Sequence, residues 1–87
     1  MEEETKRRIE ELFEIERDRL EGKLKLSDED DEKLLFFVRC NEQAVHLSEV
    51  LDYTATDLIE LGFNKKGARD RLLAWIYSMR GIYVARQ

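Results

Sequence analysis

Basic side chains follow one another at close spacing in the last third of the chain. Lys65, Lys66 and Arg69 are followed by Arg71 two positions later. Long basic side chains reach phosphate oxygens, and an arginine can also hold a guanine edge through two hydrogen bonds. This segment therefore predicts a surface that binds nucleic acid. The predicted contact residues are Asn64, Lys65, Lys66, Arg69, Arg71, Arg80 and Arg86.

Charge is distributed unevenly along the chain. Residues 1–53 hold 9 Lys or Arg against 17 Asp or Glu, whereas residues 54–87 hold 6 against 3. The two parts carry formal charges of −8 and +3, which together give the −5 of the whole chain. Because phosphate binding depends on local rather than total charge, the basic part is compatible with nucleic-acid binding. The alternative is an ordinary solvated helix face, and Asp70 within the run would repel phosphate unless it is paired.

Other kinds of chemistry find little support in the residue pattern. Cys40 and His46 are the only cysteine and histidine, so neither an intrachain disulfide nor a zinc site with set ligand spacing is predicted. The acidic run from Asp28 to Asp31 lacks the spaced ligands and the central glycine of a calcium-binding loop. No nucleophile elbow or phosphate-cradling glycine loop is found. We therefore expect a protein that is not an enzyme and that uses no metal and no cofactor.

Length and composition predict one small cytoplasmic domain. The chain has 87 residues, of which 43% are hydrophobic and 40% charged, and it contains no proline. It is too apolar for a disordered chain, and no apolar run is long enough to span a membrane, so no membrane contact is expected. No apolar secretory segment follows the charged N-terminus. The abundance of Glu, Lys and Arg is typical of thermophilic sources, and also of designed or highly helical proteins.

Residues 2–24 are predicted to form an amphipathic helix. The apolar side chains that share one stripe, within roughly 120° on a helical wheel, are Ile9, Leu12, Phe13, Leu20 and Leu24. Glu16 lies in the middle of this stripe, which argues against a regular coiled coil. Two roles remain open for this helix. It packs on its own domain, with Glu16 near the edge or paired to a basic residue, or it forms a homodimer contact through Ile9, Leu12, Phe13 and Leu20.

The middle of the chain predicts further helices and one short strand. Ser27 is a good N-cap, and the acidic residues behind it suit the positive end of a helix dipole. Residues 34–38 are five consecutive apolar residues, so this helix is expected to be central and contacted on most sides. Residues 44–47 allow a short strand. A helix is expected to begin at Ser48 and to bend near residues 52–53.

The last third predicts a short helix, a tight turn, a longer helix and an extended tail. Gly62 suits the left-handed position at the end of the short helix, and Asn64 can cap the longer one. The stripe of the longer helix consists of Ala68, Leu72, Trp75, Ile76 and Met79. Gly81 is expected to end this helix, because residues 82–84 favour an extended segment.

Residues 44–87 resemble the helix-turn-helix of a winged-helix DNA-binding domain. In this resemblance Gly62 and Phe63 form the turn, residues 65–80 form the recognition helix, and residues 82–86 form a wing strand that pairs with residues 44–47. The resemblance implies a small transcriptional regulator that binds duplex DNA through helix 65–80, as a homodimer. Leu58 departs from the family pattern, which usually has a small residue there.

Residues 54–79 also resemble the end of a sterile alpha motif (SAM) domain. The matching positions are Thr54, Asp57, Leu58, Leu61, Gly62, Phe63, Gly67, Arg69, Leu72, Leu73 and Ile76. This resemblance implies a protein-interaction module in which the basic start of the last helix contacts the acidic middle of a neighbouring subunit. It gives no role to residues 81–87, and few residues remain upstream for the several short helices that a SAM domain needs.

The predicted fold class is mainly α, with four or five helices, a helix-turn-helix and at most a minimal β wing. Residues 1–26 are expected to be an N-terminal amphipathic helix for packing or dimerisation, and residues 27–87 a winged-helix-like domain. DNA binding is the preferred function, and a SAM-like interaction with a protein partner through the last helix is the alternative. The tail separates them, because continuation of the last helix through residues 82–86 would rule out the wing and favour the SAM interpretation.

Overall fold

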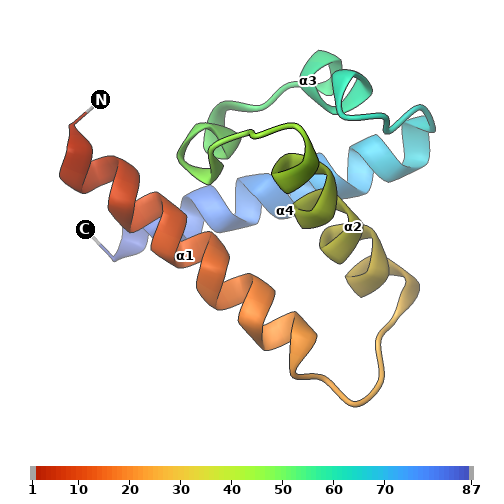
Figure 1. Ribbon diagram of the computed structural model, residues 1–87, viewed down its shortest axis with the longest axis horizontal. Helices are drawn as coiled ribbons and strands as arrows, with labels where there is room; N and C mark the ends of the chain where they lie inside the picture. The colour runs from red at the N-terminus through yellow and green to blue at the C-terminus, as the bar shows by residue number, and fades with distance from the viewer. Residues whose placement is uncertain (1, 87) are drawn as a thin grey trace.

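Five helices make up the part of the chain that the structure, a computed structural model, describes: residues 2–86 (Figure 1). They are α1 (Glu3–Glu21), α2 (Asp28–Glu42), the 3₁₀ helix η1 (Leu47–Asp52), α3 (Ala55–Glu60) and α4 (Lys66–Ala85). In Figure 1, α4 runs behind α1 and α2, and both chain ends lie on the left. The predicted mainly α fold is therefore confirmed.

The two segments expected to form the wing are not strands. Ala44 lies in a turn, residues 45–46 are irregular and Leu47 begins η1, whereas α4 continues past Gly81 to Ala85. The expectation that Gly81 ends the helix is wrong. A glycine costs a helix only about 1 kcal/mol relative to alanine and a β-branched residue less, so packing easily outweighs both. Tyr83 supplies such packing because it lies against the core.

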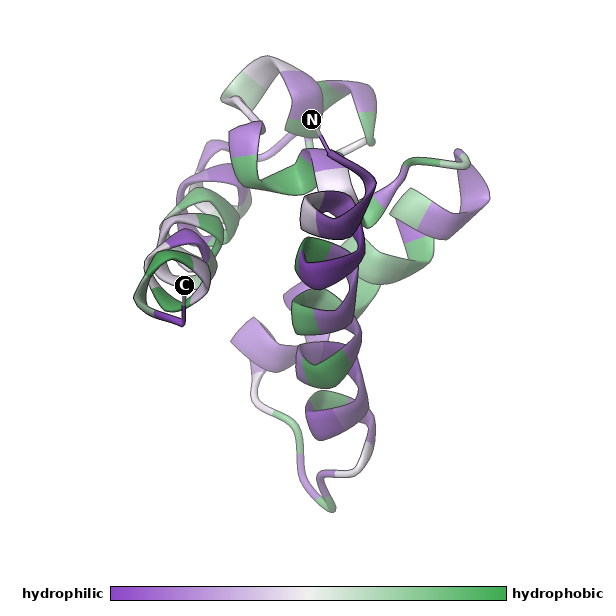
Figure 2. Cartoon of the chain, turned by 90° about the vertical axis from the view of Figure 1, so that its left-hand side faces the viewer, coloured by the Kyte–Doolittle hydropathy of each residue, from purple (hydrophilic) through white to green (hydrophobic). Residues whose placement is uncertain are grey.

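Aromatic rings from three helices form the centre of the core. Phe36 of α2 is fully buried, and its ring centroid lies 5.6 Å from that of Trp75 on α4. The ring of Phe13 on α1 lies 5.8 Å from Trp75 in an edge-to-face arrangement, which aromatic pairs prefer. In Figure 2 the hydrophobic positions of α1 recur among hydrophilic ones, as in an amphipathic helix. α1 therefore contributes directly to the core that α2 and α4 form.

The stripe predicted to form a dimer contact is buried within one chain. Its members Ile9, Leu12, Phe13 and Leu20 expose 2%, 8%, 0% and 0% of their surface. Their assignment to a homodimer contact is therefore wrong, because they already pack against helices of their own chain. Glu16, in the middle of the stripe, pairs with Arg19, as the packing interpretation expected. α1 ends at Glu21, so Leu24 lies outside the helix.

A capping box begins α2 at the predicted Ser27. The Ser27 hydroxyl accepts a hydrogen bond from the backbone N–H of Asp30 at 3.1 Å, and the Asp30 carboxylate accepts one from the N–H of Ser27 at 3.2 Å. Lys23 in the preceding loop donates to the same carboxylate at 2.7 Å. These hydrogen bonds lower the pKa of Asp30 from 3.8 to about 2, and the bond from Lys23 contributes most. One carboxylate thus joins the loop to the helix start.

Replacement of Asp30 by Asn is expected to destabilise the protein in a pH-dependent way. Because the pKa of Asp30 is lower in the folded than in the unfolded state, its charge stabilises the fold above the ordinary value of 3.8, and this contribution is lost as the pH falls to about 2. The free energies of unfolding of wild type and Asp30→Asn should therefore differ near neutral pH and converge in acid. Urea unfolding followed by circular dichroism measures both. A difference that is independent of pH would contradict the prediction.

The apolar run of α2 is covered on one side only. Phe36 and Phe37 are buried, whereas Leu35 and Val38 expose 42% and 53% of their surface. The expectation that this helix is contacted on most sides is therefore wrong. In so small a domain α1, α4 and the α3–α4 turn cover only the inner face of α2, so consecutive apolar residues cannot all reach the core.

The segment between α2 and α4 contains the predicted bend and turn. η1 ends at Asp52, and Thr54 begins α3 with a second capping box. Gly62 has a φ of 95°, which confirms the predicted left-handed position. Asn64 is not the N-cap of α4, because the turn extends one residue further and Lys65 takes that position without a side-chain cap.

Candidate interaction surface

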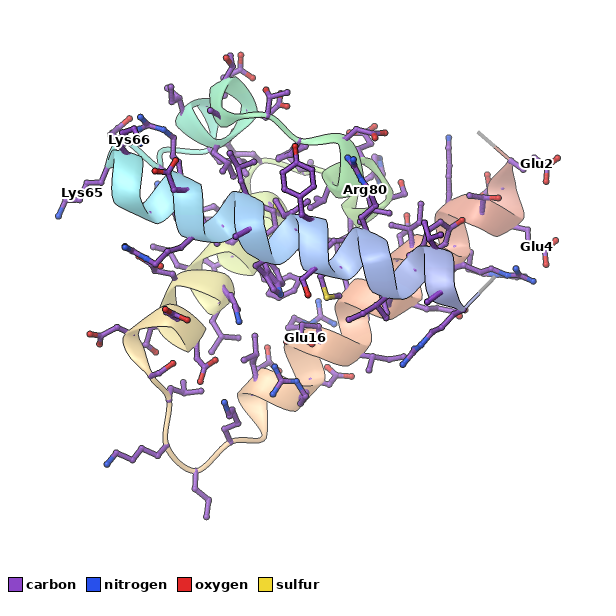
Figure 3. All side chains as sticks on the ribbon, turned by 180° about the vertical axis from the view of Figure 1, so that it is seen from behind. Glu2, Glu4, Glu16, Lys65, Lys66 and Arg80 are labelled. Carbon is purple, nitrogen blue, oxygen red and sulfur yellow. The ribbon has the colours of Figure 1, made fainter. Side chains whose placement is uncertain are left out.

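The residues predicted to contact DNA do not form one surface. α4 spans 20 residues, which corresponds to a length of about 30 Å. Asn64, Lys65 and Lys66 lie at its start, whereas Arg80 and Arg86 lie toward its end. In Figure 3, Lys65 and Lys66 project from one end of the molecule, and Arg80 lies well along the helix. A single basic strip along α4 is therefore not formed.

Arg71 is engaged by α2. Its Nε and NH2 groups donate to the two carboxylate oxygens of Glu32 at 2.8 and 2.6 Å, a bidentate pair between residues 39 positions apart. This hydrogen bonding lowers the pKa of Glu32 and raises that of Arg71. Gly67 gives the guanidinium room, because a Cβ at that position would lie 3.3 Å from NH1 of Arg71. Arg71 therefore joins α2 to α4 instead of being free for phosphate.

Arg69 and Arg80 also bond within the chain. Arg69 NH1 donates to the carbonyl of Phe63 at 3.1 Å, which stabilises the turn before α4. Arg80 donates to the carbonyl of Leu51 and lies 3.5 Å from the Asp52 carboxylate, so it joins α4 to η1. Both side chains are half-buried. Their partners lie in other elements, so the sequence pattern gave no sign of them.

The start of α4 keeps a positive surface. Lys65 and Lys66 are exposed, and no side chain caps the first N–H groups of the helix. Lys66 donates to Asp70 at 2.7 Å and lowers its pKa, so this acidic residue is paired. Exposed ammonium groups and the positive end of a helix dipole both attract negative charge. We call Lys65, Lys66 and Arg69 the basic end.

Acidic side chains gather on η1 and α3. Between Cys40 and Asn64 the chain contains five acidic residues and no Lys or Arg. Burial raises the pKa of Tyr53 to about 12, and the charges of Cys40, Asp57, Glu49 and Glu60 add to the rise. We call Glu49, Asp52, Asp57 and Glu60 the acidic face. From the sequence, these residues could be recognised only as part of an acidic region in the middle of the chain.

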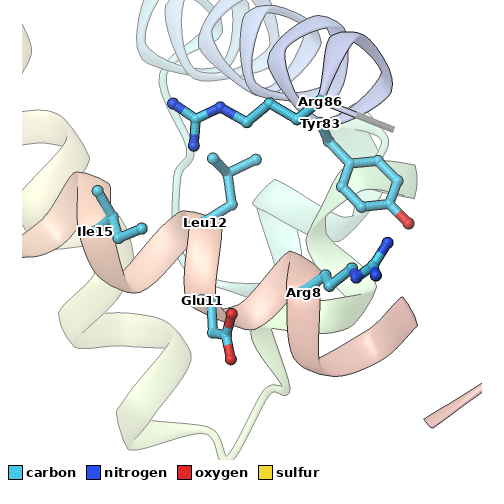
Figure 4. A pocket seen from close by; sticks show the side chains of 6 residues that line it. All are labelled: Arg8, Glu11, Leu12, Ile15, Tyr83 and Arg86. Carbon is cyan, nitrogen blue, oxygen red and sulfur yellow. The ribbon is translucent and has the colours of Figure 1, made fainter. Parts of the chain in front are cut away.

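A pocket of about 270 Å³ lies between α1 and the end of α4. Figure 4 shows Arg86 extended above Leu12, with Tyr83 and Arg8 together at the other end. Glu11 also lines it, so its charges are mixed. Arg86 therefore belongs to a different part of the surface from the basic end.

Other potential sites are weaker. Within residues 2–86, no group of three or more His, Cys, Asp or Glu side chains could hold a metal ion. The helices of this part of the chain include none that is long and apolar enough to cross a membrane. Burial raises the pKa of the Cys40 thiol to about 12, so it is a poor nucleophile. Comparison of the chain with models of protein families, with curated proteins and with solved structures found no significant match.

Proposed function

We propose that this chain is a protein-interaction module of the SAM type that joins copies of itself end to end. The observation that carries the proposal is the continuation of α4 through residues 82–85. The winged-helix interpretation needs an extended segment there, whereas the SAM resemblance is compatible with an uninterrupted last helix. Upstream of the matched residues 54–79, the chain forms α2 and the short 3₁₀ helix η1, and this resemblance requires further helices there.

The charge distribution supports a contact between unlike surfaces. The basic end of one copy is complementary to the acidic face of the next, around Glu49 and Glu60. Such a contact uses two different patches, so each copy keeps one patch of each kind for a further neighbour, and open chains or rings result. Because these groups are exposed, the attraction is expected to weaken with salt.

DNA binding through α4 is the second candidate, and one observation favours it. Lys65 and Lys66 are exposed at a helix start that no side chain caps, where phosphate binds well. Three of the predicted contact arginines, Arg69, Arg71 and Arg80, are engaged within the chain. The whole chain also carries a net charge of −5. We therefore rank this function second.

The proposal predicts a specific result for two double variants. Lys65→Glu/Lys66→Glu reverses the two exposed lysines of the basic end, and Glu49→Lys/Glu60→Lys reverses two exposed carboxylates of the acidic face. At low micromolar protein and low salt, about 50 mM, where charge attraction is little screened, each variant alone should be monomeric. An equal mixture should form one-to-one heterodimers and nothing larger, because each variant retains one intact surface. Sedimentation velocity measures the masses, and Lys6→Glu, on the exposed start of α1, is the matched control.

Two outcomes would contradict this function. One is a wild type that remains a monomer under the same conditions. The other is a mixture of variants that fails to associate. The same samples are titrated against labelled duplex DNA. Binding that weakens by about one log unit per log unit of salt for each phosphate neutralised, and that Lys65→Glu/Lys66→Glu abolishes, would support the second candidate instead.

A further inference from the structure

The loop between α1 and α2 presents a leucine to solvent. Leu24 has a relative exposure of 107%, the largest among the exposed large hydrophobic side chains of residues 2–86. The loop itself is held in place: the backbone N–H of Lys23 donates to the carbonyl of Leu20 at 3.2 Å, and its ammonium group donates to Asp30. Leu24 is thus an apolar projection on the α1–α2 loop, which lies at the bottom of the molecule in Figure 1. A single exposed apolar side chain is common on protein surfaces, so a role for Leu24 depends on an apolar surface that could receive it.

An apolar surface of this kind lies between α1 and α2. An open groove of about 600 Å³ is lined by Leu34, Phe37 and Val38. Val38 exposes 53% of its surface and Leu35, on the same outer side of α2, exposes 42%. Phe37 is the buried floor, so the groove leads from exposed side chains to the core. The groove is large enough to admit a leucine side chain, and its apolar lining matches leucine in chemistry.

We propose that the loop and the groove form a contact between two copies of this chain, in which Leu24 of one copy enters the α1–α2 groove of the other. Charge complementarity identifies the occupant. The groove rim carries Arg17, Glu21 and Glu42. Arg17 lies 4.0 Å from Glu21, so these two charges offset each other and Glu42 gives the rim a net negative charge. Lys25 follows Leu24, and neither it nor Glu42 has an ion-pair partner among the described residues.

The contact is self-complementary. Loop and groove belong to the same two helices, α1 and α2, so one two-fold axis places each Leu24 in the other groove. Lys25 then lies beside Glu42 twice. An acidic segment would be repelled by Glu42, whereas the loop brings a basic residue beside its leucine. The residues of this contact are not shared with the basic end or the acidic face, so the inference does not depend on the proposed function.

The test uses chains in which the end-to-end contact is removed by Lys65→Glu/Lys66→Glu. In this background sedimentation equilibrium at concentrations up to about millimolar should detect a monomer–dimer equilibrium, weak because one leucine and one charge pair carry each half of the contact. Adding Leu24→Asp or Val38→Asp should weaken dimerisation about tenfold or more, which corresponds to the burial of a charge in an apolar groove. Ile59→Asp is the matched control, because Ile59 is 47% exposed but lies on α3. Its dimerisation should equal that of the background.

Charge reversal tests the orientation of the contact. Lys25→Glu and Glu42→Lys should each weaken the dimer, and the combination of both should restore it. Circular dichroism verifies that every variant is folded, which is expected because the altered side chains are exposed. A background chain that remains monomeric at about millimolar concentration, a typical upper limit for weak specific contacts, would overturn the inference. So would a Leu24→Asp variant that dimerises as the background does, whatever the result for the end-to-end contact.

Discussion

Replacement of Phe36 by alanine should cost about 3–5 kcal/mol of unfolding free energy, the range for removing a large buried aromatic side chain. Phe36 is fully buried, and its ring contacts those of Phe37, Tyr53, Phe63 and Trp75. These rings come from α2, the segment after η1, the α3–α4 turn and α4. The cavity left by alanine would therefore touch most elements of the fold, and no single helix could move to fill it.

The measurement is thermal and urea unfolding followed by far-UV circular dichroism. A domain of this size is stable by about 5–15 kcal/mol, and 1 kcal/mol shifts its Tm by about 4–8 °C. The Tm of Phe36→Ala should therefore fall by about 12 °C or more. Leu35→Ala, one position earlier, is the matched control because Leu35 is 42% exposed, and it should cost less than about 1 kcal/mol. Equal losses in the two variants would contradict the orientation of α2.

Replacement of Gly62 by alanine should cost about 2–4 kcal/mol, for two separable reasons. Its φ of 95° is a conformation that residues with a Cβ rarely adopt. A Cβ there would also lie 2.0 Å from NH1 of Arg39. That group donates to the carbonyl of Leu61 at 3.1 Å, and its guanidinium lies 5.2 Å from the centroid of the Phe63 ring. Alanine would strain the backbone and displace Arg39 from both contacts.

A double-mutant cycle separates the two terms. In an Arg39→Ala background, Gly62→Ala should cost only the backbone part, about 1–3 kcal/mol, because no guanidinium remains to be displaced. Gly81→Ala is the matched control, since a Cβ at that helical position would meet nothing within 4 Å. It should stabilise the protein by about 0.5–1 kcal/mol, because alanine is the better helix former. A loss at Gly81, or no loss at Gly62, would contradict this account of the two glycines.

Features set by local chemistry could be predicted from the sequence. Ser27 begins α2 and Gly62 ends the short helix, because a cap hydroxyl and a left-handed glycine act within a few residues of their position. The inner stripe of α1 follows from helical periodicity, which also predicts a mainly α fold. The acidic and basic parts of the surface follow from the uneven distribution of charged residues along the chain. None of these features requires knowledge of what lies across the core.

Only the tertiary structure determined where α4 ends, which arginines are engaged within the chain and whether the apolar stripe of α1 is buried. Propensity disfavours a helix at Gly81 and residues 82–84 by small amounts, and the packing of Tyr83 on the core outweighs it. The sequence shows arginines at Arg71 and Arg80, but their partners Glu32 and Leu51 lie 39 and 29 positions away. Burial of Ile9, Leu12, Phe13 and Leu20 within one chain depended in the same way on how α1 meets the other helices. Periodicity identifies an apolar stripe, but only the assembled fold determines whether that stripe meets its own chain or another, because both remove the same surface from water.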